Sequence, residues 1–174
     1  KSKIQRLKSN HNTIPKLAAI LVGDDPASQV YVSSKGKAFK KMDCATETYC
    51  LPENIKENEL IQIVQSLNDD DSVHGILIQL PLPKVLNSKK ILQTVNPNKD
   101  VDGFHPLNIG YLFEGNPQFV PCTPNGVIEI LDFYNIQTEG CHAVIIGRSN
   151  IVGKPMFGLL AQRLRKGNAT VTMC

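Results

Sequence analysis

The chain of 174 residues has no apolar run that approaches the length of a membrane span, and no apolar segment of signal-peptide length near its start. Its net charge of +3 is small, and its aromatic and basic residues do not interleave as they do in nucleic-acid-binding proteins. It also lacks internal repeats and low-complexity segments. With 41% hydrophobic and 20% charged residues, the sequence predicts a soluble globular protein that binds neither membrane nor nucleic acid.

Cysteine occurs five times, at positions 44, 50, 122, 141 and 174, in a pattern that excludes two common uses. No two cysteines form a C-x-x-C pair, and no group of histidine and cysteine residues has the spacing of a zinc site. The number is also odd. We therefore expect free thiols in a reducing compartment, which predicts a cytoplasmic protein without a bound metal.

Both ends of the sequence indicate that it is part of a longer polypeptide. The first residue is Lys1 rather than methionine, and the chain stops at Cys174, directly after the strand-like segment 169–174. A domain rarely ends on a strand with nothing after it. We therefore expect a truncated chain.

Apolar runs and helical patterns alternate along the chain, which predicts an α/β fold with a wound parallel sheet. The clearest strand is Leu17–Gly23, which is apolar up to its final glycine and is therefore predicted to be buried on both faces. Further strands are predicted over 45–51, 73–80, 142–147 and 169–174. Helices are predicted over 28–42, 57–68, 87–95, 124–134 and 152–165.

A long connection rich in turn residues, 96–123, divides the chain into two predicted domains. So long an irregular segment in a compact protein is usually functional. The boundary is predicted near Thr123. Residues 1–123 would then form the first domain, and residues 124–174 the β-α-β half of a second, dinucleotide-binding domain.

Lys35 is the most informative single residue, because it falls on the inward side of the predicted helix 28–42. At about 100° per residue, four apolar or aromatic side chains lie within about 60° of it, namely Tyr31, Ala38, Phe39 and Met42. The other three lysines of this helix fall on the opposite side. Burial lowers the pKa of a lysine, and such a lysine can donate or accept a proton near neutral pH. A snorkelling lysine with its head in water is the alternative.

Gln79 ends an apolar strand, and a buried amide of this kind needs hydrogen-bond partners. In wound sheets, ligands bind outside the carboxyl ends of the strands. Gln79 and the start of the helix that holds Lys35 both lie at those ends. The sequence therefore predicts that Tyr31, Lys35 and Gln79 gather at one edge of the sheet, with the Lys35 amine facing the Gln79 amide.

Two further segments contain candidate binding residues. The loop 147–155 joins a strand to a helix, which is where dinucleotide-binding domains bind phosphate. It lacks the G-x-G-x-x-G spacing of the general fingerprint. A tight turn without a ligand is the alternative interpretation of this loop. Arg148 suits a phosphate and favours NADP over NAD. In the segment 100–106, Asp100 and Asp102 stand two positions apart before a glycine turn, and we do not expect both to point into one cleft. A carboxylate turn is the simpler interpretation there, and His105 is expected to be structural.

Five stretches together resemble the family of bifunctional methylenetetrahydrofolate dehydrogenase / methenyltetrahydrofolate cyclohydrolase, in the right order and over nearly the whole chain. They are 22–35, 75–83, 99–106, 121–126 and 147–156. The resemblance implies a folate-binding catalytic domain followed by part of a Rossmann-like NADP-binding domain. It implies NADP-dependent oxidation of methylenetetrahydrofolate, then hydrolysis to formyltetrahydrofolate, in one-carbon metabolism and purine biosynthesis. A homodimer is also expected by resemblance.

The resemblance also implies a role for each site residue. Lys35 would be the catalytic lysine of the hydrolysis, with Tyr31 stacked on the folate and Gln79 bonded to Lys35. Asp102 would bind the pterin, and Pro81 and Leu82 would line the folate cleft. The residues that hold NADP would be Thr123, Gly147, Arg148, Ser149, Ile151 and Val152.

The sequence departs from the family because the rest of the cofactor domain and the C-terminal helix are missing. If this truncation holds in solution, we expect weak cofactor binding and no dehydrogenase turnover. Two alternatives therefore stay open beside the two-activity enzyme. One is a non-catalytic folate-binding fragment, and the other is a shikimate-type dehydrogenase of similar architecture.

Overall fold

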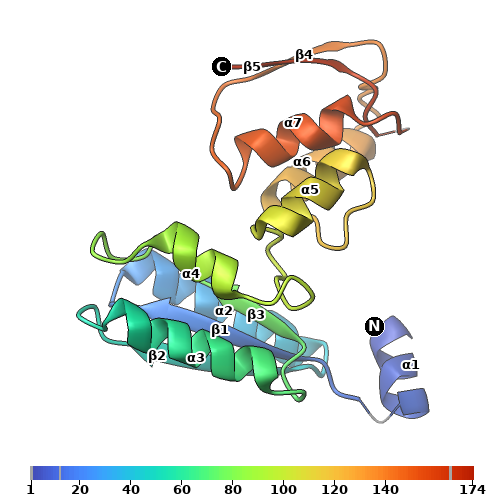
Figure 1. Cartoon of the computed structure of the whole chain (residues 1–174). Helices are drawn as coiled ribbons and strands as arrows, with labels where there is room; N and C mark the ends of the chain where they lie inside the picture. Colours follow the sequence, from blue (N-terminus) through green and yellow to red (C-terminus); the bar gives the residue numbers. More distant parts are fainter. Residues whose placement is uncertain (1, 12, 165) are drawn as a thin grey trace. The chain divides into compact units, whose positions relative to one another are not determined.

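The computed structural model describes residues 2–11, 13–164 and 166–174, and the chain divides into two units (Figure 1). The first unit runs to Lys99, and the second is Asp100–Cys174. This division lies before the domain boundary predicted near Thr123, because the helices after Lys99 pack with the elements that follow them. The functional boundary at Thr123 stays a prediction.

The first unit is built on a three-stranded parallel sheet in the order β2-β1-β3. The strands are β1 Lys16–Val22, β2 Ala45–Leu51 and β3 Gly75–Ile78. β1 lies in the middle, and its Ile20 pairs with both neighbouring strands. The predicted strands are confirmed, although β3 is shorter than the predicted 73–80.

Three helices accompany this sheet, namely α2 Pro26–Lys41, α3 Glu57–Asp69 and α4 Ser88–Thr94. Figure 1 shows α3 and α4 on the same side of the sheet, and the two helices pack against each other. The periodic side chains of α3 and the Ile91 side chain of α4 join one face of β1 and β3 in a single core. α2 packs against β1 and β2. β1 is buried along nearly its whole length, as its apolar run predicts.

The second unit is built around α7 Gly153–Ala161. This helix packs against α5 Pro106–Glu114, α6 Cys122–Phe133 and the strands β4 His142–Ile145 and β5 Thr170–Met173. β4 and β5 form a two-stranded parallel sheet. The small core between these elements is centred on Ile128, Met156 and Leu160.

Three differences from the sequence-based expectation concern helices. The structure has a helix α1 over Ser2–His11, for which the sequence analysis made no prediction. α7 ends at Ala161 rather than near 165, because Gln162 adopts an extended conformation. The connection 96–123 is not irregular throughout, since it contains α5. His105 caps α5, Pro106 opens it and Gly115 closes it in the left-handed region. Within the described ranges, no helix combines the length and apolar composition needed to cross a lipid bilayer.

Candidate active site

The helix that holds Lys35 begins directly after the central strand. Gly23 adopts φ +82°, a conformation that a side chain disfavours, and its N–H donates to Leu51 O at 2.9 Å. The Asp25 carboxylate then accepts the Ser28 N–H at 2.7 Å and caps α2, and Pro26 occupies the first turn. The hydrogen bonds from Ser28 hold the pKa of Asp25 below its usual value.

The inward side of α2 differs in part from the prediction. Val32 is buried and Lys35 is half-buried, but Tyr31 is 62% exposed. The inward side is centred near Val32, and Tyr31 lies about 100° around the helix from it. The expectation that Tyr31 is an inward residue was therefore wrong, as it was for Ala38 and Met42, whereas Phe39 is half-buried. The prediction that the remaining lysines face water is confirmed at Lys37, Lys40 and Lys41.

The predicted hydrogen bond between Lys35 and Gln79 is present, since Lys35 Nζ donates to Gln79 Oε1 at 3.3 Å. The backbone N–H of Gln79 donates to Ile20 O at 2.9 Å, which fixes the residue at the carboxyl end of β3. Its side-chain amide donates to Leu80 O at 2.8 Å, so the amide oxygen is left to face the lysine. The structure thus orients one acceptor toward the half-buried ammonium. The catalytic roles of Lys35, Tyr31 and Gln79 stay predictions.

The segment after Gln79 contains the two residues predicted to line the folate cleft. Pro81 is exposed. Leu82 is only 8% exposed, and its side chain belongs to the core that α3 and α4 share with the sheet. Leu82 therefore anchors the segment, and Pro81 is the member of the pair that a ligand can reach.

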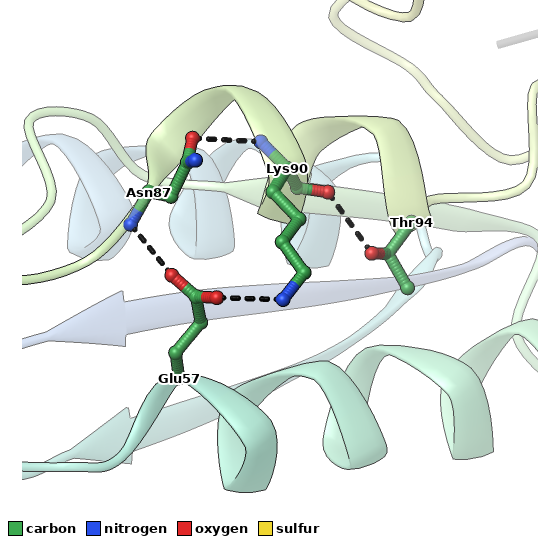
Figure 2. Close-up of polar contacts among 4 residues, drawn as sticks. All are labelled: Glu57, Asn87, Lys90 and Thr94. Carbon is green, nitrogen blue, oxygen red and sulfur yellow. Dashed lines mark hydrogen bonds and ion pairs between the residues drawn. The ribbon is translucent and has the colours of Figure 1, made fainter.

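A cluster of polar side chains links α4 to α3 and so fixes the end of the segment that runs from Gln79 to α4 (Figure 2). The Glu57 carboxylate accepts the Asn87 N–H at 2.9 Å and the Lys90 ammonium at 2.8 Å. Asn87 Oδ1 accepts the Lys90 N–H at 3.1 Å and caps α4. Lys90 and the Asn87 N–H lower the pKa of Glu57.

Lys99 has a structural role that the sequence analysis missed. Its ammonium donates to three carbonyl oxygens at the end of α3, those of Leu67 at 3.1 Å, Asn68 at 2.7 Å and Asp70 at 2.8 Å. Carbonyl groups at the end of a helix have no partner within the helix, and a cation is favourable there. Its position just before the two aspartates was the only sequence signal.

Asp100 and Asp102 differ in their surroundings. Asp100 is 5% exposed, and its carboxylate accepts the N–H groups of Phe104 and His105 at 3.2 and 2.8 Å. This supports the carboxylate-turn interpretation at Asp100. Asp102 is half-buried. His105 is structural, as expected, because its Nδ1 accepts the Leu107 N–H at 3.1 Å and caps α5.

The loop between β4 and α7 brings five of the six predicted cofactor residues together in the second unit. Gly147 adopts φ +124°, and the side chain of Ser149 accepts the N–H groups of Val152 and Gly153 at 3.1 and 3.3 Å. A Cβ on Gly153 would overlap Gly147 O, so only glycine fits there. Arg148 and the side chains of Ile151 and Val152 are exposed. The first N–H groups of α7 are thus bonded within the loop, and the exposed Arg148 is the group of this loop that suits a phosphate.

Thr123, the sixth predicted cofactor residue, lies in the first turn of α6 and is exposed. Two clefts include none of the predicted site residues. One is lined in the second unit by the end of α6, the segment 135–139 and Lys166, and the other in the first unit by Gly23, Asp24 and residues 50–53. Among the described residues, no group of three or more histidine, cysteine, aspartate and glutamate side chains could hold a metal ion.

Comparison with protein families gives two matches that cover most of the chain. The catalytic domain of tetrahydrofolate dehydrogenase/cyclohydrolase matches residues 1–102. The NAD(P)-binding domain of tetrahydrofolate dehydrogenase/cyclohydrolase matches residues 121–174.

Individual relatives agree with these matches. The bifunctional protein FolD of Streptococcus mutans is 54% identical over 172 residues, and that of Streptococcus agalactiae is 55% identical over 171. The crystal structure of the bifunctional FolD of Campylobacter jejuni is 52% identical, with a TM-score of 0.92, over 99% of this chain and 60% of that one. The FolD of Trypanosoma brucei, solved with NADP and an inhibitor, is 34% identical, with a TM-score of 0.92, over 99% of this chain and 58% of that one. The chain spans about 59% of the length of the curated relatives that it matches.

Proposed function

The chain belongs to the tetrahydrofolate dehydrogenase/cyclohydrolase family, and on this premise we propose that it comes from a bifunctional enzyme of folate metabolism. The enzyme oxidises 5,10-methylenetetrahydrofolate to 5,10-methenyltetrahydrofolate with NADP, and then hydrolyses the product to 10-formyltetrahydrofolate. The observation that carries this proposal is the half-buried Lys35 ammonium bonded to Gln79 Oε1 at 3.3 Å.

The hydrolysis needs a group that moves a proton while water adds to the methenyl carbon, and Lys35 is suited to this task. Its amine has one oriented acceptor in Gln79, whose own amide is fixed by Leu80 O. A lysine amine that is held in one direction can donate or accept a proton at a fixed position in the site. We assign the proton transfer to Lys35 and its orientation to Gln79.

The other folate contacts follow from the family resemblance. Tyr31 is exposed on the same helix as Lys35, where its ring is available to stack on a planar ligand. Pro81 is also exposed. Leu82 is buried in the core and thereby holds the segment after Gln79 in place. Asp102 offers a carboxylate that matches the N–H and amino donors of a pterin.

The residues of the second unit fit a dinucleotide. Gly153 has no Cβ, which lets the Gly147 carbonyl lie against the start of α7, and Arg148 is exposed in the same loop. In this assignment Gly147, Ser149, Ile151 and Val152 shape the loop around the phosphate, and Thr123 lies toward the nicotinamide. The bound NADP would accept the hydride, and the protein would hold the two reacting carbons in place. The relative from Trypanosoma brucei was solved with NADP, which supports this choice of cofactor.

The alternatives are reduced to one. Family matches over both parts of the chain do not favour a shikimate-type dehydrogenase. A folate-binding fragment without turnover is still a separate outcome of the experiment below. The homodimer, the cytoplasmic location and the place in purine biosynthesis that the sequence suggests stay predictions.

Hydrolysis of methenyltetrahydrofolate, followed by the loss of its absorbance and corrected for the spontaneous reaction, tests the proposal. We expect Lys35→Met to abolish the catalysed rate and to leave folate binding largely intact. The matched control is Lys37→Met, an exposed lysine of the same helix, which should hydrolyse at the wild-type rate. A Lys35→Met variant that is as fast as the wild type would contradict the assignment. A wild-type chain that binds folate without hydrolysis would indicate the fragment.

A further inference from the structure

We propose that Asp100 is a positioning residue, whose buried carboxylate fixes the segment 101–105 and thereby the direction in which Asp102 meets the folate. The inference rests on the proposed function, because it takes Asp102 as the pterin-binding residue. Asp100 would prepare the contact between Asp102 and the pterin and would not itself touch the ligand.

The carboxylate of Asp100 is surrounded by donors of its own segment and of α5. Oδ1 accepts the Phe104 N–H at 3.2 Å, and Oδ2 accepts both the His105 N–H and Asn108 Nδ2 at 2.8 Å. Asp100 is 5% exposed and Asn108 is fully buried. Hydrogen bonds to a buried charged group are stronger than those between neutral groups. The three bonds therefore hold the chain between Asp100 and α5 in one conformation.

Gly103 holds the same segment from its other side. Its N–H donates to Asp100 O at 3.1 Å, and its φ of +68° is one that residues with a side chain rarely adopt. A Cβ at this position would lie 3.1 Å from Phe119 O and 3.2 Å from Pro121 Cδ. The backbone on either side of Asp102 is thus fixed by the Asp100 carboxylate and by this close approach.

A fixed segment improves binding, because the entropy of ordering it is lost on folding and not when the ligand arrives. An asparagine at position 100 would keep the size of the side chain but place an NH₂ group against backbone N–H donors. At least one of the backbone N–H groups that the carboxylate now accepts would then have no acceptor, and the segment 101–105 would be held less firmly. The expected result is weaker folate binding with unchanged chemistry at Lys35.

Hydrolysis of methenyltetrahydrofolate by Asp100→Asn, with separate values of KM and kcat, tests this inference. We expect KM to rise by about tenfold, which corresponds to about 1.4 kcal/mol, and kcat to stay within about twofold of the wild type. Amide hydrogen exchange at Phe104 and His105 should become faster. The matched control is Asp70→Asn in the first unit, which also removes a carboxylate that accepts a backbone N–H in a turn, that of Ser72 at 2.8 Å. This control should leave KM and both exchange rates unchanged.

A second variant keeps the test decisive if Asp100→Asn does not fold. Asn108→Ala removes one of the three donors and leaves the carboxylate in place, so KM should rise by a smaller factor, again without loss of kcat. An unchanged KM in a folded variant at either position, or a fall in kcat with KM constant, would overturn the positioning role alone. A wild-type chain that neither binds nor hydrolyses methenyltetrahydrofolate would overturn the proposed function and this inference with it.

Discussion

β1 and β4 have similar sequences but different surroundings. Each is an apolar segment that leads into a glycine of positive φ, Gly23 at +82° and Gly147 at +124°, and each is followed by a helix. β1 lies between two strands, and its Ile20 is completely buried. Among the described residues β4 pairs with β5 alone, and Val144 on it is 58% exposed.

This difference shows what an apolar run does and does not predict. The run predicts that a segment is extended and suits burial, but the burial itself depends on partners along both edges and over both faces. β1 has these partners within the first unit. In the second unit, α7 covers Ala143 and Ile145 on one face of β4, and within the described part of the chain Val144 on the other face is exposed. Equal hydrophobicity should therefore give unequal contributions to stability.

Truncation of one side chain on each strand should break this comparison most strongly. We expect Ile20→Ala to lower the free energy of unfolding by about 2–5 kcal/mol, because it removes buried methyl groups and leaves a cavity. Val144→Ala on the exposed face of β4 should cost about 1 kcal/mol or less. Urea unfolding followed by circular dichroism measures both. Equal shifts of the two midpoints would mean that the open face of β4 is covered in solution.

The glycine that opens α7 provides a second, smaller test. A Cβ on Gly153 would overlap Gly147 O, so Gly153→Ala must displace the loop. We expect a cost of about 1–3 kcal/mol, as for overpacking in other proteins, together with weaker binding of NADP measured by calorimetry.

The matched control for this variant is Gly126→Ala in α6, where a Cβ meets no atom within 4 Å. An alanine there should be neutral or should stabilise the helix by up to about 1 kcal/mol. If both variants bound NADP as the wild type does, the loop would not be the phosphate site.

The smallest effect concerns pH and distinguishes two ion-paired residues, Glu57 in the first unit and Lys166 in the second. Lys90 and the Asn87 N–H lower the pKa of Glu57, so its contribution to stability is present above the usual value of 4.5 and is lost as the pH falls through the lower folded value. Glu129 and Asp132 raise the pKa of Lys166. Its contribution is present below the usual value of 10.5 and is lost as the pH rises through the higher folded value.

Melting temperatures across pH measure this contrast. Glu57→Gln should melt below the wild type at pH 7, and the difference should shrink in acid. Lys166→Met should also melt lower at pH 7, but its difference should shrink in alkali instead. The ion pairs of Glu57 and Lys166 lie on the surface, so the differences in melting temperature are expected to be modest. A Glu57→Gln difference that grows in acid would contradict the assigned direction of the shift.

The sequence predicted the features that depend on neighbours along the chain. Strand and helix patterns located β1, β2, α3 and α4. The Lys35–Gln79 contact was also predicted, because the carboxyl ends of parallel strands meet at one edge.

The features that were missed depend on distant segments. The Lys99 ammonium donates hydrogen bonds to carbonyl groups about thirty positions earlier in the chain. The sequence around Lys99 has no pattern that predicts these partners. Tyr31 was placed inward because the helix face was centred on Lys35, whereas the buried side chain Val32 sets the actual centre. α5 was overlooked because turn residues on both sides hid its proline start and its glycine end.

The three carbonyl acceptors of Lys99 have a consequence for work at different ionic strengths. Mobile ions weaken attraction between two full charges at the surface, such as Glu57 and Lys90, because they gather around each charge. Lys99 is half-buried, and the groups that hold it are dipoles of the backbone, which attract few counter-ions. Concentrated salt should therefore weaken the ion pair of Glu57 and Lys90 between α3 and α4, while the hydrogen bonds of Lys99 to the end of α3 persist.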